Sequence, residues 1–562
     1  MFFLRIISVI IIIWIIALIF YDYFIQGKYA IFANFPGIGR FRHLFHELRP
    51  FLRQYFGDDD AFAPRVIIDW IRDVAEGRSG YFAFDKFDTS KLFDDARNAM
   101  IHSNAPYNDD EMTPMYPLVG QYKRYPLQFH TYFYRSAMSL WSLWFEATTA
   151  MAKACANVHA VFNTWEWWLS IHHLPNLKYS PDKKFLLTKK LPIWTKMFHK
   201  LVPWVRLKNR FIERCWNYFE PKKGERDLFL FSRDYWVFYA INRDAPLEYF
   251  PKPEDVTEEE YGQIILQIWS GLYWLRKKTD DSNHIELDRE RFQKTASFVR
   301  AIEIKLAQWA KQTGWILKAH KNTHTIATIR WVKEGIDLLS PNRFPYYHAW
   351  DEKWFFEFLD MVSEKSWWKP VGCKVVISDR SNIEAIAQQI QKTPKWRWLD
   401  FITIDGGDWW SGAAPIALGI MYGKNVYDAI ELVVEVLQKY GVRDRVKIFA
   451  SSKLYAPSMS ARALASWADA IWNARSIMIA WWCIRAWLCS GEHWVCPIGM
   501  ATMDKSKRRW YEQVMVEKVF HIMNYIKAHN KWLIQAAAVA GITSPHLFGK
   551  KHLTFFQTRV WN

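Results

Sequence analysis

Cysteine is scarce in this chain. Six cysteines occur in 562 residues: Cys155, Cys215, Cys373, Cys483, Cys489 and Cys496. That number and spacing exclude the disulfide framework of a small secreted protein and favour reduced thiols in the cytosol. Internal repeats, low-complexity tracts and nucleic-acid-binding motifs are also absent. We therefore relate the formal net charge of +17 to an anionic membrane surface rather than to nucleic acid.

Glycine is scarce as well, with 23 residues against 33 tryptophans, whereas average glycine usage is about 7%. Tandem tryptophans stand where tight loops normally need glycine, as in NTWEWW and DGGDWWSGAAP. Such loops demand positive φ or close backbone approach, which bulky rings oppose. Two explanations are open. Either the source reads the UGA codon as glycine and a translation table that reads it as tryptophan produced these residues, or the protein is truly rich in tryptophan.

The chain starts with a long apolar run. Residues 6–20 read IISVIIIIWIIALIF, and the run extends to Ile25 around a lone Asp22, close to the roughly 20 residues that span a bilayer. No small-residue cleavage site follows, which disfavours a signal peptide. Only Arg5 precedes the run, whereas several basic residues follow it: Lys28, Arg40, Arg42, Arg49 and Arg53. The positive-inside rule therefore predicts a single-pass membrane anchor over residues 1–27 with a cytoplasmic catalytic domain.

From about residue 125, short apolar runs alternate with longer amphipathic ones, which indicates strands alternating with helices. The predicted strands are Tyr132–Ala137, His159–Asn163, Ile302–Leu306, Ile336–Leu339, Val371–Ile377, Phe401–Asp405, Val446–Ala450 and Ala470–Ala474. The predicted helices are Phe145–Ala156, Thr323–Lys333, Glu352–Glu364, Asn382–Gln391, Val426–Tyr440 and Met459–Trp467. Eight strands joined through helices predict parallel pairing and a closed (β/α)₈ TIM barrel, an α/β fold.

The strand spacing also predicts the domain organisation. The barrel occupies residues 125–505, and a large insertion over 177–260, rich in Lys, Arg and aromatics, separates strands two and three. That insertion is either a membrane-facing or lid subdomain, or an ordinary solvated elaboration. We expect an N-terminal helical region over 28–124 that packs on the barrel and a C-terminal helical tail over 506–562.

Polar and small residues recur at the carboxyl ends of the predicted strands, where TIM barrels carry their working residues. In chain order they are Ser136, Ser139 and Ser142; Asn163, Thr164 and Glu166; Lys305, Gln308 and Lys311; Lys374; Asp405, Gly406 and Gly407; Ser451, Ser452 and Lys453; and Ala474 and Arg475. One such cluster means little, because loops are polar anyway. Their recurrence at successive strand ends predicts a functional site.

Two features of this predicted site have a chemical interpretation. Small residues after strands seven and eight let backbone N–H groups face a phosphate, so 451–453 and Arg475 suit a cofactor phosphate, although a lone serine is also an ordinary helix cap. Lys305 and Lys374 lie within apolar strands, where an unpaired ammonium is costly. We therefore expect these lysines to bind an anionic group.

Five strings resemble the FMN-binding synthase domain of glutamate synthase, especially its stand-alone relatives. They lie at Ser136–Trp141, Asn163–Trp168, Ile304–Lys311, Asp405–Pro415 and Cys496–Thr502. The matching family patterns are S-A-M-S-F-G, N-T-G-E-G-G, I-K-L-x-Q-G-A-K, D-G-G-x-G-G-T-G-A-A-P and C-P-x-G-x-A-T. Tryptophans replace most of the missing family glycines: Trp141, Trp165, Trp167, Trp168, Trp309, Trp409 and Trp410. The resemblance covers roughly 30–175 and 260–530.

The resemblance implies FMN at the barrel mouth, with 2-oxoglutarate or a similar oxo acid stacked on it. It adds Met138, and it adds Gln267 and Ser270, because QIWSGLYW matches the family stretch Q-I-G-S-G-x-F-G. The implied cofactor-binding residues are these three, with Ser136, Ser139, Asn163, Lys305, Lys374, Asp405, Gly406, Gly407, Ser451, Ser452, Lys453, Ala474 and Arg475. The implied catalytic residues are Lys305, Lys374, Glu166 and Gln308.

The chain also departs from the family. It begins with the apolar run rather than with a nucleophilic cysteine of a glutaminase domain, so ammonia is expected from solution or from a partner. The family spaces three cysteines C-x₅-C-x₄-C for a [3Fe–4S] cluster. Cys483 and Cys489 keep that spacing, but SGEHWV makes the step from Cys489 to Cys496 two residues longer. The three thiolates either ligate such a cluster or pack as free thiols.

The sequence thus predicts an FMN-dependent oxidoreductase that reduces an oxo or imino acid to the amino acid, glutamate-forming by resemblance. Lys305 and Lys374 would hold anionic groups, including a reduced flavin. Electrons would arrive through the cluster or from an electron-donor protein. Two alternatives are a non-catalytic, membrane-tethered flavin-binding or scaffold protein, and an FMN-dependent hydroxy-acid oxidase, for which no convincing active-site His–Arg pair is found.

Overall fold

A computed structural model describes most of the barrel region. The described residues are 2–25, 36–37, 40–41, 48, 65–81, 98–138, 143, 145–164, 169–174, 176–201, 230–232, 234–277, 285–306, 315–317, 319, 322, 327, 330, 332–341, 343–347, 353–407, 423–483, 500 and 511–555. They fall into two compact units. One contains residues 1–65 with 484–487, and the other contains 66–483 with 488–562.

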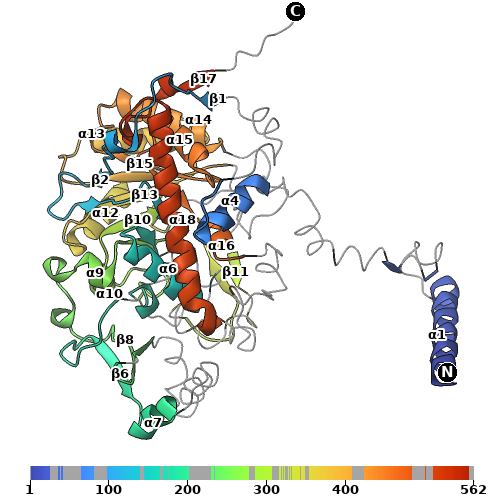
Figure 1. Cartoon of the computed structure of the whole chain (residues 1–562). Coiled ribbons are helices and arrows are strands. Elements are labelled where there is room, and N and C mark those ends of the chain that lie inside the picture. Colours follow the sequence, from blue (N-terminus) through green and yellow to red (C-terminus); the bar gives the residue numbers. More distant parts are fainter. Residues whose placement is uncertain are drawn as a thin grey trace, which may run out of the picture. The chain divides into compact units, whose positions relative to one another are not determined.

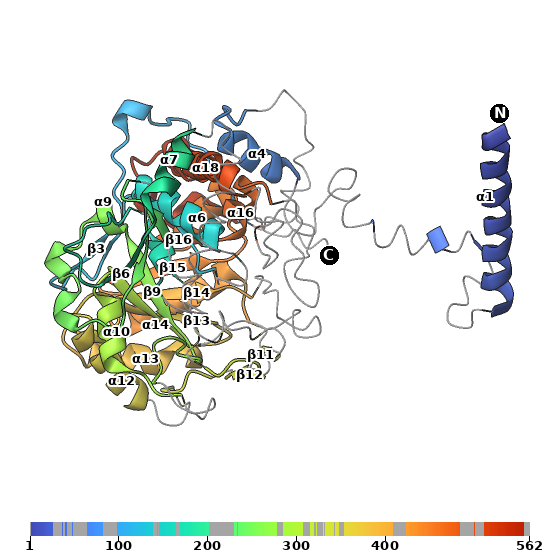
Figure 2. The same ribbon diagram turned by 90° about the horizontal axis from the view of Figure 1, so that it is seen from below.

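Eight parallel strands of the second unit close into a barrel, which helices surround (Figure 1, Figure 2). They are β4 (Phe133–Arg135), β5 (Phe162–Asn163), β9 (Ile264–Ile268), β10 (Ala301–Lys305), β13 (Val371–Val375), β14 (Phe401–Asp405), β15 (Lys447–Ser451) and β16 (Ala470–Asn473). Each strand pairs with the next one along the chain, and β16 closes the barrel on β4. The predicted (β/α)₈ barrel is confirmed.

Seven of the predicted strands overlap a barrel strand, but the fourth prediction is wrong. Residues 338–340 form β12 (Leu338–Ser340), which pairs antiparallel with β11 (Trp315–Leu317) outside the barrel. The remaining barrel strand is β9, directly after the insertion. All five of its residues are buried. A strand covered on both faces carries no apolar–polar alternation, so its sequence resembles any short apolar run.

Helices flank the strands of the barrel. They are α6 (Phe145–Asn157), α10 (Arg289–Ala296), α12 (Lys353–Lys365), α13 (Ser381–Gln391), α14 (Val426–Lys439), α15 (Pro457–Ala465) and α16 (Arg475–Ala480). Helix α14 illustrates how the local sequence forms such a helix. The Asn425 side chain accepts hydrogen bonds from two backbone N–H groups at its start, and its apolar residues recur on one buried face. Five predicted helices agree with these, whereas most of the sixth, 323–333, lies outside the described residues.

Further elements cover the barrel. The long helix α18 (Tyr511–Val539) packs against α6, α15 and α16 (Figure 1). Strand β1 (Asn98–Met100) pairs with β17 (Leu553–Phe555), so two segments distant in sequence lie side by side. The short helices are α4 (Arg65–Ala75), η2 (Asp109–Glu111), η3 (Ile171–His173), η5 (Leu247–Tyr249), η6 (Pro253–Asp255), α9 (Glu258–Tyr261), η9 (Pro545–Leu547) and η10 (Lys550–His552).

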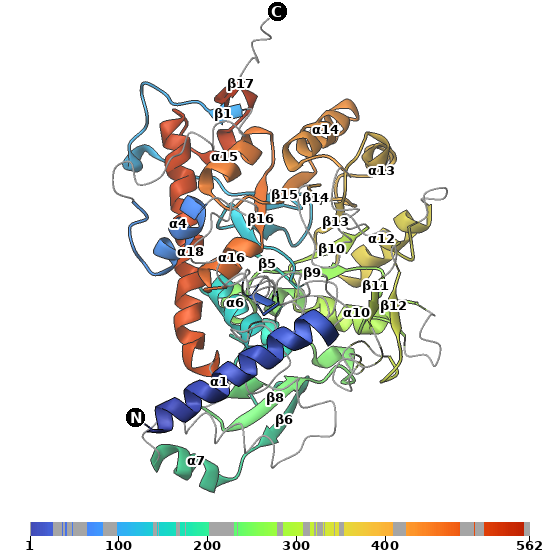
Figure 3. The same cartoon turned by 90° about the vertical axis from the view of Figure 1, so that its right-hand side faces the viewer.

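Between β5 and β9, the described part of the predicted insertion contains a small antiparallel sheet. Its strands, in spatial order, are β6 (Leu186–Lys190), β8 (Val237–Ile241) and β7 (Leu230–Ser232), and α7 (Ile193–Leu201) follows β6. This sheet and α7 lie together, away from the barrel strands (Figure 1, Figure 3). Helix α7 exposes apolar side chains, among them Ile193 at 80% and Leu201 at 79%.

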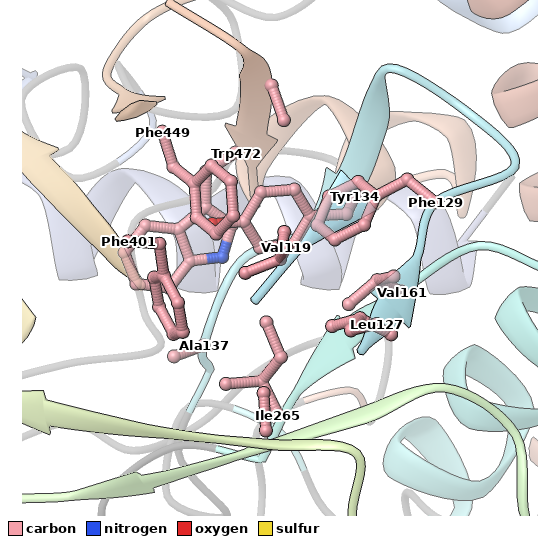
Figure 4. Packing of buried hydrophobic residues seen from close by; sticks show 12 residues of the cluster. Val119, Leu127, Phe129, Tyr134, Ala137, Val161, Ile265, Phe401, Phe449 and Trp472 are labelled. Carbon is pink, nitrogen blue, oxygen red and sulfur yellow. The ribbon is translucent and has the colours of Figure 1, made fainter. Parts of the chain in front are cut away.

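The barrel interior is closed at its amino-terminal end by a hairpin. Strands β2 (Leu118–Val119) and β3 (Leu127–Gln128) pair antiparallel, and Val119 and Leu127 join the buried cluster that fills the barrel. Figure 4 shows this cluster, in which aromatic rings from β4, β14, β15 and β16 meet. The ring centroids of Tyr134 and Trp472 lie 5.8 Å apart in a stacked arrangement. Apolar packing therefore occupies the amino-terminal half of the interior.

A buried ion pair lies beside this hairpin. The Asp400 carboxylate, just before β14, lies 3.5 Å from the Lys123 ammonium and accepts a 2.8 Å hydrogen bond from the Val371 N–H. Burial raises the pKa of Asp400 from 3.8 to about 6. Because the raised pKa favours the protonated form in the folded state, this contribution to stability is present below pH 3.8 and is lost as the pH rises through about 6.

We expect Asp400→Asn to remove that dependence. The wild-type free energy of unfolding should fall between about pH 4 and pH 6 relative to the variant, on the order of 3 kcal/mol at about 1.4 kcal/mol per pKa unit. Urea titrations of both proteins across this range measure it. Parallel pH profiles for the two proteins would contradict the assignment.

The predicted membrane anchor is wrong, and so is the single-pass localisation with a cytoplasmic catalytic domain. Within the part of the chain that the structure describes, no helix is long and apolar enough to cross a membrane. Helix α1 (Phe2–Phe20) has 19 residues, about 28 Å at 1.5 Å per residue, and gives way to the π-helical turn η1 (Tyr21–Ile25). In that turn the Asp22 carboxylate accepts hydrogen bonds from the Gly37 N–H and the Arg40 guanidinium.

Candidate functional site

Polar side chains replace the apolar ones in the carboxyl-terminal half of the barrel interior. Alternate residues of a strand face the same side, so Ala301, Glu303 and Lys305 of β10 all point inward. Ala301 belongs to the apolar cluster, and the two charged residues follow it toward the strand end. The barrel therefore changes from an apolar core to a charged site within one strand.

Glu303 is the first of the two charged residues of β10, and several polar side chains meet at its carboxylate. Its side chain is fully buried and accepts hydrogen bonds from the Asn163 amide at 2.9 Å, from the Thr403 hydroxyl at 2.5 Å and from the Gln267 amide. Burial raises the pKa of Glu303 above its ordinary value, while these donors and Lys374 oppose that shift. Four strands are thus held in register by one carboxylate.

The two predicted lysines lie nearer the carboxyl ends of the strands than Glu303 does. Lys305 and Lys374 are direct neighbours in the β10–β13 pairing and are 0% and 5% exposed. The Lys374 ammonium lies 3.0 Å from the Asp405 carboxylate and 4.2 Å from the centre of the Trp472 ring. The Lys305 ammonium lies 4.1 Å from the centre of the Trp269 ring. Two buried cations at neighbouring strand ends can bind an anionic ligand.

The ends of β15 and β16 form a second polar corner. Ser451 and Ser452 are buried, and within the described residues their hydroxyl groups have no hydrogen-bond partner. Buried polar groups are normally paired, so these hydroxyls are free to bind a ligand oxygen. The Asn473 amide donates to the Leu454 carbonyl at 2.6 Å and fixes the loop after β15. Lys453, in the same loop, is half-buried. This corner suits a phosphate group.

The other predicted residues that the structure describes lie around the same strand ends. Ser136 and Met138 follow β4, and Ser270 follows β9, where its hydroxyl donates to the Pro341 carbonyl at 2.5 Å. Gly406 and Gly407 follow β14, and their N–H groups donate to the Ser451 and Lys424 carbonyls. Ala474 and the half-buried Arg475 follow β16.

Several predicted residues lie outside the described part of the chain. They are Ser139, Ser142, Glu166, Gln308, Lys311, Cys489 and Cys496. Cys483 is described: it directly follows the turn after α16 and is partly exposed. Among the described residues no group of three or more His, Cys, Asp or Glu side chains is arranged to hold a metal ion.

Two buried residues of the site were not predicted. Glu303 stands in AIEIK, where a lone carboxylate among apolar strand residues was the available signal. Arg135 ends β4, and its guanidinium donates to the Asn163 carbonyl at 2.6 Å and to the Met138 carbonyl at 3.4 Å. Burial lowers the pKa of Arg135 to about 10. In the sequence, the available signal for Arg135 was a lone arginine at the end of an apolar strand.

Comparison with known proteins identifies the family. Residues 252–543 match the family model described as a conserved region in glutamate synthase, which is more than half of the chain. The chain belongs to the glutamate synthase family. The matched region contains β9, β10 and β13–β16, and hence both buried lysines and the serine corner.

Relatives within this family are similar to about half of the chain. A glutamate synthase large subunit-like protein, YerD, of Bacillus subtilis (strain 168) is 35% identical over 292 residues, 52% of this chain and 53% of its own length. An archaeal glutamate synthase (NADPH) of Methanocaldococcus jannaschii is 30% identical over 247 residues, 43% of this chain and 46% of its own. The chain spans about half the length of these curated relatives.

Solved structures are more distant. A putative lactate oxidase of Pediococcus acidilactici matches with a TM-score of 0.42 and 11% identity over 88% of this chain and 94% of its own. The L230A mutant of flavocytochrome b2 with benzoylformate matches with a TM-score of 0.39 and 9% identity over 95% and 91%. At these scores the likeness carries no functional argument.

Proposed function

We propose that this protein is an FMN-dependent oxidoreductase of the glutamate synthase type. It reduces 2-oxoglutarate or 2-iminoglutarate, or a similar oxo or imino acid, to the amino acid with ammonia from outside the chain. The observation that carries the proposal is the pair of buried Ser451 and Ser452 hydroxyls, which have no hydrogen-bond partner among the described residues, in a barrel whose other strand ends carry the buried cations Lys305 and Lys374.

The residues of the site fit FMN by their chemistry. The unpaired buried hydroxyls of Ser451 and Ser452, with Lys453 and Arg475 beside them, would hold the phosphate. Bound FMN would supply the hydride chemistry, while the protein binds and orients the reactants. Lys305 and Lys374 would hold the carboxylate of the oxo acid and the negative charge that develops during reduction. Glu166 and Gln308 remain proposed catalytic residues.

Asp405 and Glu303 would have supporting roles. Asp405 holds the Lys374 ammonium from one side, which orients it toward the interior. Glu303 fixes Asn163 and Gln267, two residues that the family resemblance implies at the cofactor. Preorganised cations cost no reorganisation when charge develops on the reacting group.

Lys453→Glu tests the proposed phosphate site at the ends of β15 and β16. Opposing the phosphate charge should weaken FMN binding at least about 10-fold, whereas Lys395→Glu, at the exposed amino-terminal side of β14, should leave it unchanged. Flavin absorbance after reconstitution and gel filtration measures both variants. A protein that stays colourless with added FMN, both with Trp269 and with glycine at that position, would refute the site.

The electron source is a further part of the proposal. Cys483, Cys489 and Cys496 would ligate a [3Fe–4S] cluster that receives electrons from a donor protein. Cys483→Ser should abolish the cluster's electron paramagnetic resonance signal in anaerobically prepared, then oxidised protein, because a hydroxyl does not replace a thiolate ligand. Cys155→Ser, a buried thiol within α6, is the matched control and should keep the signal. Iron near zero alongside full flavin would leave a flavin-only enzyme.

One observation favours a second candidate, a non-catalytic flavin-binding or scaffold protein. The Trp269 and Trp472 rings are fully buried against the two lysines, in space that a ligand would need. Flavin binding without turnover of any oxo acid, using a strong chemical reductant and ammonia, would support this candidate over the enzyme.

A further inference from the structure

Three helices of the barrel end at a tryptophan in the left-handed conformation. After α12, Trp367 has φ +56° and the Trp368 N–H donates to the Ser363 carbonyl at 2.7 Å. After α15, Trp467 has φ +73° and the next N–H donates to Ala463 at 3.0 Å. After α16, Trp482 has φ +71° and the next N–H donates to Met478 at 2.9 Å. Each is a Schellman motif, in which the residue with positive φ is usually glycine.

Three other helices end in the same motif with glycine in the same place. After α4, Gly77 has φ +78°, and the Arg78 N–H donates to Asp73 at 2.9 Å. After α14 and α18, Gly441 and Gly541 have φ +66° and +74°, and the next N–H donates five residues back at 2.9 and 3.1 Å. Glycine and tryptophan therefore occupy one backbone position interchangeably, although only glycine adopts it without steric cost.

Tryptophans with positive φ also occur away from helix ends. Eight non-glycine residues of the described chain have positive φ, and six of them are tryptophans: Trp236, Trp274, Trp367, Trp368, Trp467 and Trp482. The non-glycine residues that most often adopt this region are Asn, Asp and His, and among the eight only His159 is one of them. A truly tryptophan-rich protein has no physical reason to place its largest side chain there.

We propose that the natural protein carries glycine at these six positions, because its source decodes as glycine a codon that is here translated as tryptophan. The same assignment extends to Trp269, which stands with Trp274 in the string QIWSGLYW directly after β9. Its ring covers the Lys305 ammonium at 4.1 Å. With glycine at 269, the space beside Lys305 opens to a ligand. This last step rests on the proposed function, whereas the backbone argument does not.

Peptide mass spectrometry of the protein isolated from its natural source decides the assignment. Peptides containing positions 367, 467 and 482 should each have the mass of the glycine form. Tryptophan at these positions would overturn the proposal, whatever the protein's activity.

Recombinant variants provide an independent test. In the chain as printed, Trp367→Gly and Trp482→Gly should each raise the midpoint of thermal unfolding, since they relieve positive φ. Trp354→Gly, at an exposed position in the first turn of α12 where φ is not positive, should not raise it, because no left-handed residue is relieved there. Lower midpoints for both cap variants would count against the proposal.

Trp269→Gly separates the two levels of the argument. An increase in bound FMN over the printed chain supports the open site. Another outcome is that the cap variants unfold at higher temperature and the peptides have the glycine mass while Trp269→Gly binds no FMN. In that case the glycine assignment stands and the proposed function fails.

Discussion

Replacing Lys374 with methionine is expected to lower the free energy of unfolding by about 3–5 kcal/mol and to abolish turnover. The Asp405 carboxylate lies 3.0 Å from the Lys374 ammonium, and both side chains are buried. Removing one partner of a buried pair leaves the other charge uncompensated, which is why the loss is large. The proposed role at the reacting group adds a loss of about 100-fold or more in kcat. Urea unfolding and steady-state kinetics measure the two effects.

The double variant Lys374→Met/Asp405→Asn separates stability from function. Without the carboxylate, no charge is left unpaired, and most of the lost stability should return. Activity should not return, because the cation is still missing. Recovery of turnover together with stability would show that Lys374 only supports the fold and would remove it from the proposed chemistry.

Glu303→Ala is expected to destabilise the barrel by at least about 3 kcal/mol, because three buried donors lose their acceptor and a cavity remains. These donors come from three different strands, so the loss should also loosen the positions of Asn163 and Gln267. Glu303→Gln keeps the size and one acceptor oxygen, and we expect it to lose less than half as much. Equal losses for the two variants would argue that the hydrogen bonds matter little.

The pH dependence of stability in the wild type and in Glu303→Gln provides a second measurement. Burial raises the pKa of Glu303 above its ordinary 4.5, so the stability linked to its protonated form is present below that pH and is lost as the pH rises through the folded-state pKa. Relative to Glu303→Gln, the wild type should therefore lose stability as the pH rises above 4.5. A wild type that gains stability over this range would show that the donors outweigh burial.

The barrel strands that the sequence predicted correctly share one property: turn or helix signals bound each apolar run. Phe401–Asp405 ends in two glycines, and its predicted range equals β14. Strand β9 was missed although Gly262 and Gly271 bound its apolar run as well, and Ile336–Leu339 was taken in its place. Local periodicity does not distinguish a strand that closes a barrel from one that pairs in a small hairpin, because closure depends on contacts distant in the chain.

The chemistry of the strand ends was determined by the sequence, since polar residues after apolar runs in a parallel barrel must gather at one mouth. Lys305 and Lys374 were predicted as anion binders for this reason, and they remain so in the proposal. The tertiary structure alone showed that they are direct neighbours, that Asp405 holds one of them, and that Glu303 joins four strands beneath them. These relations arise from strand register across the barrel.

The start of the chain shows the opposite case. The long apolar run and the basic residues after it predicted a membrane span there, because hydropathy does not show where a helix ends. Helix α1 ends at Phe20 and is followed by the π-helical turn η1, in which the Asp22 carboxylate forms an ion pair with Arg40. The sequence by itself determined the apolar character of this segment and the excess of tryptophan over glycine. Where that helix stops, and which tryptophans occupy a glycine conformation, were decided only by the folded backbone, because φ and helix termination are set by hydrogen bonds that composition does not contain.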